Sequence, residues 1–151
     1  MEAPRRSGFT LIEIMAVVLI IGLLTTLVGI AIIPRIEQGR VTTARVQLKN
    51  LGTALETYHM DNAVFPTTDQ GLIALINPPP DARNYQTGGY LHDRRIPPDP
   101  WGNAYQYESP GQHNEHAFDL WSWGADGKPG GSDSAADIGN WVEGSEDGEG
   151  T

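Results

Sequence analysis

The sequence predicts an α+β fold in which one long N-terminal helix packs against a short helix and a small antiparallel sheet. Three observations predict it: an uncharged apolar run over residues 14–33, an apolar stripe at helical spacing over 41–58, and a Gly- and Pro-rich remainder containing short alternating segments. In the first half of the chain apolar residues repeat every three to four positions, as in a helix. In short segments of the second half they repeat every two positions, as in a strand. With 151 residues, the chain is long enough for one modest domain plus an appendage.

Composition excludes several classes of protein. The chain has no cysteine, which rules out a disulfide framework and a thiolate metal site. Its formal net charge is −9, and residues 109–151 carry nine acidic residues against a single lysine. A surface of this charge repels nucleic acid and attracts cations.

The apolar run from Ile14 to Ile33 is twenty residues long and uncharged. A helix of that length rises about 30 Å, which is the thickness of a bilayer's hydrocarbon core. We therefore expect a transmembrane helix segment over residues 9–33. A secretory signal peptide is the alternative, but the run is long for one and no A-x-A cleavage site follows it.

One carboxylate, Glu13, lies at the start of this run. The segment from Thr10 to Glu13 fits a capping box, and a carboxylate in the first turn of a helix also favours the helix dipole. A position near the membrane edge lowers the cost of desolvating the charge. These reasons explain why a glutamate is tolerated here, but none of them requires one.

The helical pattern continues beyond the apolar run. Pro34 is expected to kink the helix or to mark its exit from the bilayer. Apolar residues then recur at spacings of three and four, at Val41, Ala44, Leu48, Leu51, Leu55 and Tyr58. This stripe predicts that a single helix of roughly 50 residues ends inside the core of a globular domain that spans residues 34–141.

Shorter elements are expected after the long helix. Residues 65–76 read as a short helix that Thr67 caps, with Gln70 in the capping-box position. Alternating residues predict one strand around Tyr105 and Tyr107 and a second around Phe118 and Leu120. The acidic tail over residues 142–151 is expected to be disordered.

The N-terminal segment resembles the signal of type IV pilins and pseudopilins, because Gly8-Phe9-Thr-Leu-Ile-Glu13 follows a short basic leader and precedes an apolar helix. The resemblance implies that a prepilin peptidase removes residues 1–8 by cutting after Gly8, and that Phe9 is then N-methylated. It also implies that Glu13 pairs with the free amine of a neighbouring subunit during assembly. Pairing within one chain stays open, since Phe9 and Glu13 are four residues apart.

Four later blocks narrow the resemblance: "FPTTDQGLIALI", "DPWGNAYQY", "WGADGKPGG" and "DIGNW". In this order they resemble the major pseudopilins of type II secretion systems (general secretion pathway protein G), over about Ser7 to Trp141. The resemblance implies a type IV pilin-like fold and a structural subunit, not an enzyme. Such a subunit polymerises with its own copies and with minor pseudopilins into a periplasmic pseudopilus, on an inner-membrane assembly platform, and drives export of folded proteins across the outer membrane.

The charges around the apolar run conflict with the expected orientation. Arg5 and Arg6 precede it, whereas the residues that follow it include Arg35, Arg40 and Arg45. The positive-inside rule would place the following domain in the cytoplasm. The resemblance implies the reverse: a single pass through the inner membrane of a Gram-negative bacterium, with the C-terminal domain in the periplasm.

The glycine-rich loop over residues 123–141 holds three aspartates, Asp126, Asp133 and Asp137. Oxygen ligands in a flexible loop suit Ca²⁺, but the spacing is not that of an EF-hand, and a solvated acidic turn is the alternative. The resemblance implies one bound Ca²⁺, held by the side chains of Asp126 and Asp133 and by the carbonyls of Trp123, Ala135 and Ile138. Asp137 would then cap the following turn or bind the ion through water.

Two other classes of protein remain as alternatives. A type IV pilin of a surface fibre shares the N-terminal signal but usually carries a C-terminal disulfide, which this chain cannot form. A membrane-tethered module that binds calcium needs neither Gly8 nor Glu13. No catalytic motif is visible: the segment from His113 to His116 has one residue too few for H-x-x-E-H, and it reads as surface.

Overall fold

The computed structural model describes residues 8–141, and within them the side chains of all residues except 26–34. The leader residues 1–7 and the acidic tail over 142–151 lie outside the described residues. Two compact units divide the chain, Met1–Glu37 and Gln38–Thr151. The elements are α1 (Leu11–Asn62), η1 (Leu72–Leu75), β1 (Gln106–Glu108), β2 (Asp119–Ser122), η2 (Gly124–Asp126), η3 (Asp133–Ala135) and β3 (Ile138–Gly139), where η marks a 3₁₀ helix.

The long helix α1 has 52 residues, as its pattern predicted. It begins with the predicted capping box: the Glu13 N–H donates to Thr10 Oγ1 at 3.3 Å, and the Thr10 N–H donates to Glu13 Oε2 at 3.2 Å. It ends where Ala63, at a φ of 63°, turns into the left-handed region. The helical assignment continues through Pro34, and a kink there stays a prediction.

Part of the predicted membrane segment is described and part is not. Where side chains are described, no helix offers an apolar stretch of the length that a membrane span needs. The side chains of residues 26–34, which complete the apolar run, lie outside the description.

The stripe on the second half of α1 builds the core of the globular unit. Ala44, Leu48, Leu51, Leu55 and Tyr58 are all buried, and Val41 packs against them, which confirms the prediction. Residues from η1 and from the strands complete this core, among them Leu75, Phe118 and Leu120. The apolar face of one helix thus finds its partner in a small sheet and a 3₁₀ turn.

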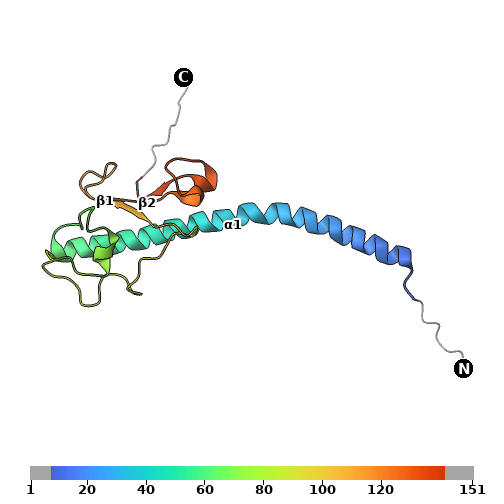
Figure 1. Cartoon of the computed structure of the whole chain (residues 1–151), viewed down its shortest axis with the longest axis horizontal. Coiled ribbons are helices and arrows are strands. Elements are labelled where there is room, and N and C mark those ends of the chain that lie inside the picture. Colours follow the sequence, from blue (N-terminus) through green and yellow to red (C-terminus); the bar gives the residue numbers. More distant parts are fainter. Residues whose placement is uncertain (1–7, 142–151) are drawn as a thin grey trace, which may run out of the picture. The chain divides into compact units, whose positions relative to one another are not determined.

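The sheet has three strands in the order β1-β2-β3, and both pairs are antiparallel. Tyr107 lies opposite Leu120 in the first pair, and Ser122 lies opposite Ile138 in the second. Figure 1 shows β1 and β2 beside the C-terminal part of α1. Both predicted strands are present, whereas β3 was not predicted, because two residues are too few to show an alternating pattern.

The predicted helix over residues 65–76 is only partly correct. Its capping pair forms as expected, since the Gln70 N–H donates to Thr67 Oγ1 at 3.2 Å and the Thr67 N–H donates to Gln70 Oε1 at 2.9 Å. The backbone then turns left-handed at Gly71, with a φ of 56°, and resumes as the short 3₁₀ helix η1. A residue in the left-handed region ends an α-helix, so the segment is two separate turns.

Candidate calcium loop and assembly motif

The segment over residues 123–137 leaves the sheet at the end of β2 and returns to it as β3. Ser122 pairs with Ile138 across the two strands, so the base of the loop is closed and Trp123 follows directly from it. Asp126 ends η2, and Asp133 begins η3; these two 3₁₀ turns are in contact. The fold therefore gathers the elements that carry all five predicted ligands.

The three aspartates of the loop have different surroundings. Asp126 is exposed, and its Oδ1 accepts a hydrogen bond from the Lys128 N–H at 3.1 Å. Asp133 has a φ of 55°, and among the described residues its carboxylate has no hydrogen-bond or ion-pair partner. Asp137 Oδ2 accepts from the Gly130 N–H at 2.9 Å, so it does not cap the next turn, while its Oδ1 is buried without a partner.

Two glycines let the loop fold closely onto itself. Gly124 and Gly131 have φ values of 68° and 92°, which side chains rarely allow. A Cβ on Gly124 would lie 2.7 Å from the Ala136 carbonyl oxygen, and one on Gly131 would collide with the Ala135 carbonyl. The backbone carbonyls of Ala136 and Ala135 therefore lie directly against Gly124 and Gly131.

The donor set fits a calcium ion. Within residues 8–141, no three His, Asp or Glu side chains gather closely enough to hold a metal by themselves. A cation in this loop must therefore take backbone carbonyls as well as carboxylates, which is how Ca²⁺ commonly fills its six to eight oxygen positions. In the ligand set that the resemblance implies, Asp126 and Asp133, with the carbonyls of Trp123, Ala135 and Ile138, would supply five such oxygens, and water would complete the shell.

A buried aspartate outside the loop anchors its base. Asp99 is 3% exposed, and its Oδ1 accepts from the N–H groups of Trp101 and Asn103 at 3.0 and 2.7 Å. Its Oδ2 accepts from Ser122 Oγ at 2.6 Å, and Ser122 Oγ in turn accepts from the Gly124 N–H at 3.1 Å. Sequence reasoning missed this role, although the Asp-Pro dipeptide at 99–100 is itself a turn signal.

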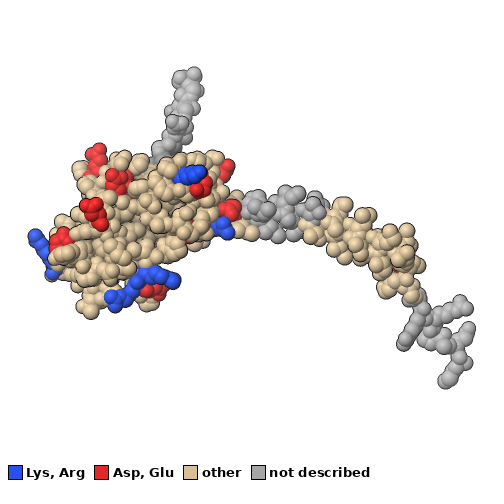
Figure 2. Space-filling view, viewed as in Figure 1, with Lys and Arg blue, Asp and Glu red and all other residues tan. Residues whose placement is uncertain are grey.

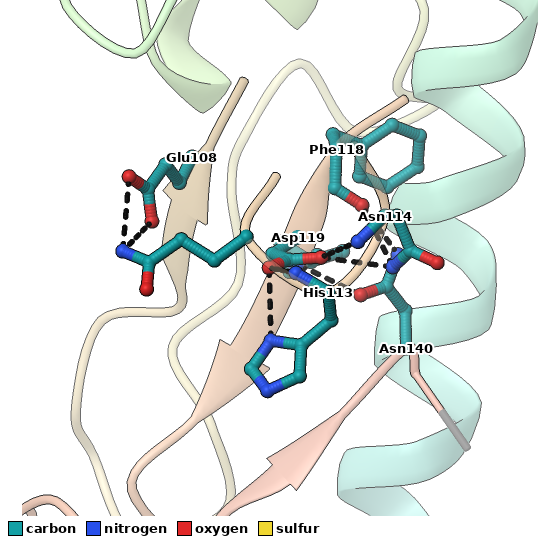
Figure 3. Close-up of polar contacts among 8 residues, drawn as sticks. Glu108, His113, Asn114, Phe118, Asp119 and Asn140 are labelled. Atoms are coloured by element: carbon teal, nitrogen blue, oxygen red, sulfur yellow. Dashed lines mark hydrogen bonds and ion pairs between the residues drawn. The ribbon is translucent and has the colours of Figure 1, made fainter. Parts of the chain in front are cut away.

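A second buried carboxylate, Asp119, organises the turn before β2. The N–H groups of His113 and Asn114 donate to its two oxygens at 2.7 and 3.0 Å, and His113 Nδ1 lies 3.0 Å from Oδ2 (Figure 3). Burial acts to raise the pKa of Asp119, but these hydrogen bonds outweigh it and the pKa is lowered. His113 is exposed, as predicted for a surface residue, and its backbone N–H and its ring also contact Asp119.

The assembly motif lies in the N-terminal unit. Gly8 is exposed with no neighbouring atom near a Cβ position, and the Phe9 side chain is 83% exposed. The Glu13 carboxylate accepts hydrogen bonds only from the N–H and hydroxyl of Thr10 among the described residues. The backbone around Gly8 is therefore open to another protein.

Two family models match the chain. The one described as "Type II secretion system (T2SS), protein G" covers residues 31–141, and the one described as "Prokaryotic N-terminal methylation motif" covers residues 3–29.

Curated relatives match over nearly the whole length. The type II secretion system core protein G of Pseudomonas aeruginosa is 49% identical over 144 residues, which cover 93% of this chain and 99% of the relative. The protein of the same name from Vibrio cholerae is 46% identical over 139 residues, covering 91% and 92%. Among solved structures, the major pseudopilin from the type 2 secretion system of enterohaemorrhagic Escherichia coli superposes with a TM-score of 0.60. It is 39% identical, and the match covers 71% of this chain and 90% of that one.

Proposed function

The chain belongs to the type II secretion system protein G family and is a pseudopilus subunit, and from this we propose how it is anchored, assembled and stabilised. The observation that carries the proposal is the family match over residues 31–141, which include the described part of the globular unit, together with the methylation motif at residues 3–29. As the major subunit, the chain would polymerise into a periplasmic fibre whose growth drives folded proteins across the outer membrane.

The anchor in this proposal is the apolar segment over residues 9–33. It would cross the inner membrane once and place the globular unit in the periplasm, after a prepilin peptidase has removed residues 1–8. This orientation opposes the positive charges that follow the helix. The leader is stronger evidence for this orientation than the positive charges are against it. The peptidase cuts on the cytoplasmic side, so residues 1–8 have to remain in the cytoplasm.

Assembly would be guided by Glu13 and the new amine of Phe9. A carboxylate in an apolar segment is costly unless a positive partner accompanies it. Thr10 supplies only neutral donors to Glu13 in the single chain. We therefore assign the ionic partner to the N-terminal amine of the next subunit, with an assembly platform in the inner membrane and minor pseudopilins as further partners.

The test of this step compares Glu13→Ala with Glu115→Gln, a loss of charge at an exposed residue of the globular unit. Full-length chains are produced in a Gram-negative host that lacks its own major pseudopilin, and cross-linked multimers in the membrane fraction are quantified. We expect Glu13→Ala to lose at least about nine-tenths of the multimers, consistent with the roughly 1.4 kcal/mol that a tenfold loss represents. Wild-type amounts of multimers in Glu13→Ala would refute the pairing but leave the family membership intact.

We also propose that the loop over residues 123–138 binds one structural Ca²⁺. The gathered oxygen donors support this, as does the Asp133 carboxylate, which lacks a partner among the described residues. A loop rich in glycine buries little apolar surface of its own, so a bound ion would replace a missing core. The ion would hold Asp126 and Asp133 against the carbonyls of Trp123, Ala135 and Ile138.

Thermal unfolding of the full-length chain in detergent micelles tests the calcium site. Saturating Ca²⁺ at about 100 times its Kd stabilises a folded state by about 2.7 kcal/mol, so the midpoint should rise by several degrees over that in a chelator. Asp126→Ala and Asp133→Ala should remove that rise, whereas Asp93→Ala, an exposed control outside the loop, should keep it. An unchanged wild-type midpoint would mean that the loop is only a solvated turn.

A further inference from the structure

A pocket of about 200 Å³ opens beside the sheet, next to the proposed calcium loop. Its lining residues come from β1, β2, the turn before β2, the loop between β2 and β3 and the end of the described chain: Glu108, Gln112, His113, Asp119, Trp121, Trp123, Asp137 and Trp141. Three of the four tryptophans of the sequence line it. We call this set of residues the tryptophan pocket.

Aromatic rings form the walls of the tryptophan pocket. Trp121 meets Trp123 and Trp141 edge to face, at centroid distances of 5.3 and 5.9 Å. The ring of His113 stacks on Trp141 at 4.1 Å with an angle of 5° between the planes. Such packed rings are held in fixed orientations, and an indole face attracts a cation through its quadrupole.

The remaining lining is acidic. Glu108, Asp119 and Asp137 contribute three carboxylates, and no lysine or arginine is among the lining residues. The Asp119 carboxylate is only 2% exposed and already accepts hydrogen bonds from His113 and Asn114, so Glu108 and Asp137 are the carboxylates left to meet a ligand. Figure 3 shows Glu108, which accepts hydrogen bonds from Gln112, on the strand next to the one that carries Asp119. One oxygen of Asp137 is buried without a partner.

Charge in the surrounding sequence points the same way. Four more acidic residues follow Trp141 in the sequence, at Glu143, Glu146, Asp147 and Glu149. The chain as a whole, with a net charge of −9, attracts a cation and repels an anion.

We propose that the tryptophan pocket receives an arginine side chain of a protein partner of the fibre subunit. A guanidinium group is planar, so it stacks on an indole face while its N–H groups donate to carboxylates at its edge. The ammonium group of lysine is compact and strongly hydrated, which suits a flat aromatic wall less well. This inference goes beyond the proposed function, and two of the lining residues, Trp123 and Asp137, belong to the proposed calcium loop.

The test uses the full-length chain in detergent micelles, with ¹⁵N-labelled tryptophan and acetyl-arginine methylamide as the probe. We expect saturable shifts in the indole signals of Trp121, Trp123 and Trp141, while Trp101, which does not line the pocket, serves as the internal control. The neutral isostere acetyl-citrulline methylamide should bind at least about fivefold more weakly, because it lacks the charge that a cation–π contact and a carboxylate require.

Three variants distinguish binding in the pocket from general electrostatic attraction. Glu108→Gln keeps the shape of a lining residue but removes its charge, and it should weaken the arginine probe about threefold, as expected for one partly exposed charge contact. Glu115→Gln removes an exposed charge that does not line the pocket, and it should leave binding unchanged. Trp141→Leu removes an aromatic wall and should abolish the shifts even if Glu108→Gln folds poorly.

Three results would overturn the proposal. Equal binding of the arginine and citrulline probes would show that charge plays no part, and equal effects of Glu108→Gln and Glu115→Gln would show that the pocket plays none. Saturable shifts with chitobiose but not with the arginine probe would identify a carbohydrate site instead, since sugars also stack on indole rings.

Discussion

At the scale of single residues, two buried carboxylates are held by neutral donors. Asp99 precedes the turn before β1 and Asp119 is the first residue of β2, and backbone N–H groups donate to each of them. Asp119 was counted with the acidic surface over residues 109–151, because composition does not distinguish a buried aspartate from an exposed one. A buried charge with several hydrogen bonds costs far less than one without them.

The titration of Asp119 makes acid stability a test of this network. Because its folded-state pKa lies below the ordinary value of 3.8, its contribution to stability is present above that value and is lost as the pH falls through the lower native pKa. We expect Asp119→Asn to cost about 1–3 kcal/mol at pH 7, through its lost charge-assisted hydrogen bonds. It should also lose less stability than wild type between pH 5 and pH 2, a window of about three units set by the carboxyl range.

Urea unfolding at each pH measures both effects. Asp93→Asn changes an exposed aspartate of the same chain and should follow wild type throughout. If the free energy of unfolding of Asp119→Asn falls as steeply with decreasing pH as that of wild type, other carboxylates cause the acid sensitivity.

At the scale of elements, the loop over residues 123–138 depends on glycine backbone more than on side-chain packing. Its two 3₁₀ turns contact each other, and the pairing of Ser122 with Ile138 closes its base. The sequence indicated a flexible acidic loop, and η2 and η3 are too short to leave a periodic pattern. Figure 1 shows this part of the chain beside β2, and it connects this central strand to the edge strand β3.

Two neighbouring glycines allow the contact between residue 131 and Ala135 to be tested separately from backbone strain. Gly130 and Gly131 both have a positive φ, at 88° and 92°, but only a Cβ on Gly131 meets another part of the loop. Gly130→Ala should therefore cost about 1–3 kcal/mol from backbone strain alone, and Gly131→Ala clearly more. Thermal unfolding in calcium and in chelator measures the difference; equal losses would mean that the contact with Ala135 is unimportant.

At the scale of the whole molecule, the globular unit has one core, and the long helix forms one side of it. The core joins α1 to η1 and to the strands, so a substitution that disrupts it should destabilise the whole globular unit. Charge is distributed differently: acidic side chains are scattered over the face in Figure 2, and the largest basic patch there lies along the lower edge of the unit. With a net charge of −9, copies of this chain repel one another until specific contacts form.

The contribution of the core is tested by Leu55→Ala against Met60→Ala. Leu55 is completely buried, whereas Met60 is 74% exposed on the same helix. Truncation of a buried leucine leaves a cavity and should lower the free energy of unfolding by about 2–5 kcal/mol, while the exposed methionine should cost well under 1 kcal/mol. Near-equal losses in chemical denaturation would mean that α1 is not an integral part of the core.

The sequence by itself determined the long helix, its buried face, the capping boxes at Thr10 and Thr67 and the family motifs. These depend on neighbours in the chain, where a repeat of three to four residues or a pair three apart is sufficient information. Only the tertiary structure decided the strand β3, the anchoring role of Asp99, and the meeting of Trp121, Trp123 and Trp141 with His113. Those features join positions up to 28 residues apart across strands and turns, and local preference does not specify which distant partners will meet.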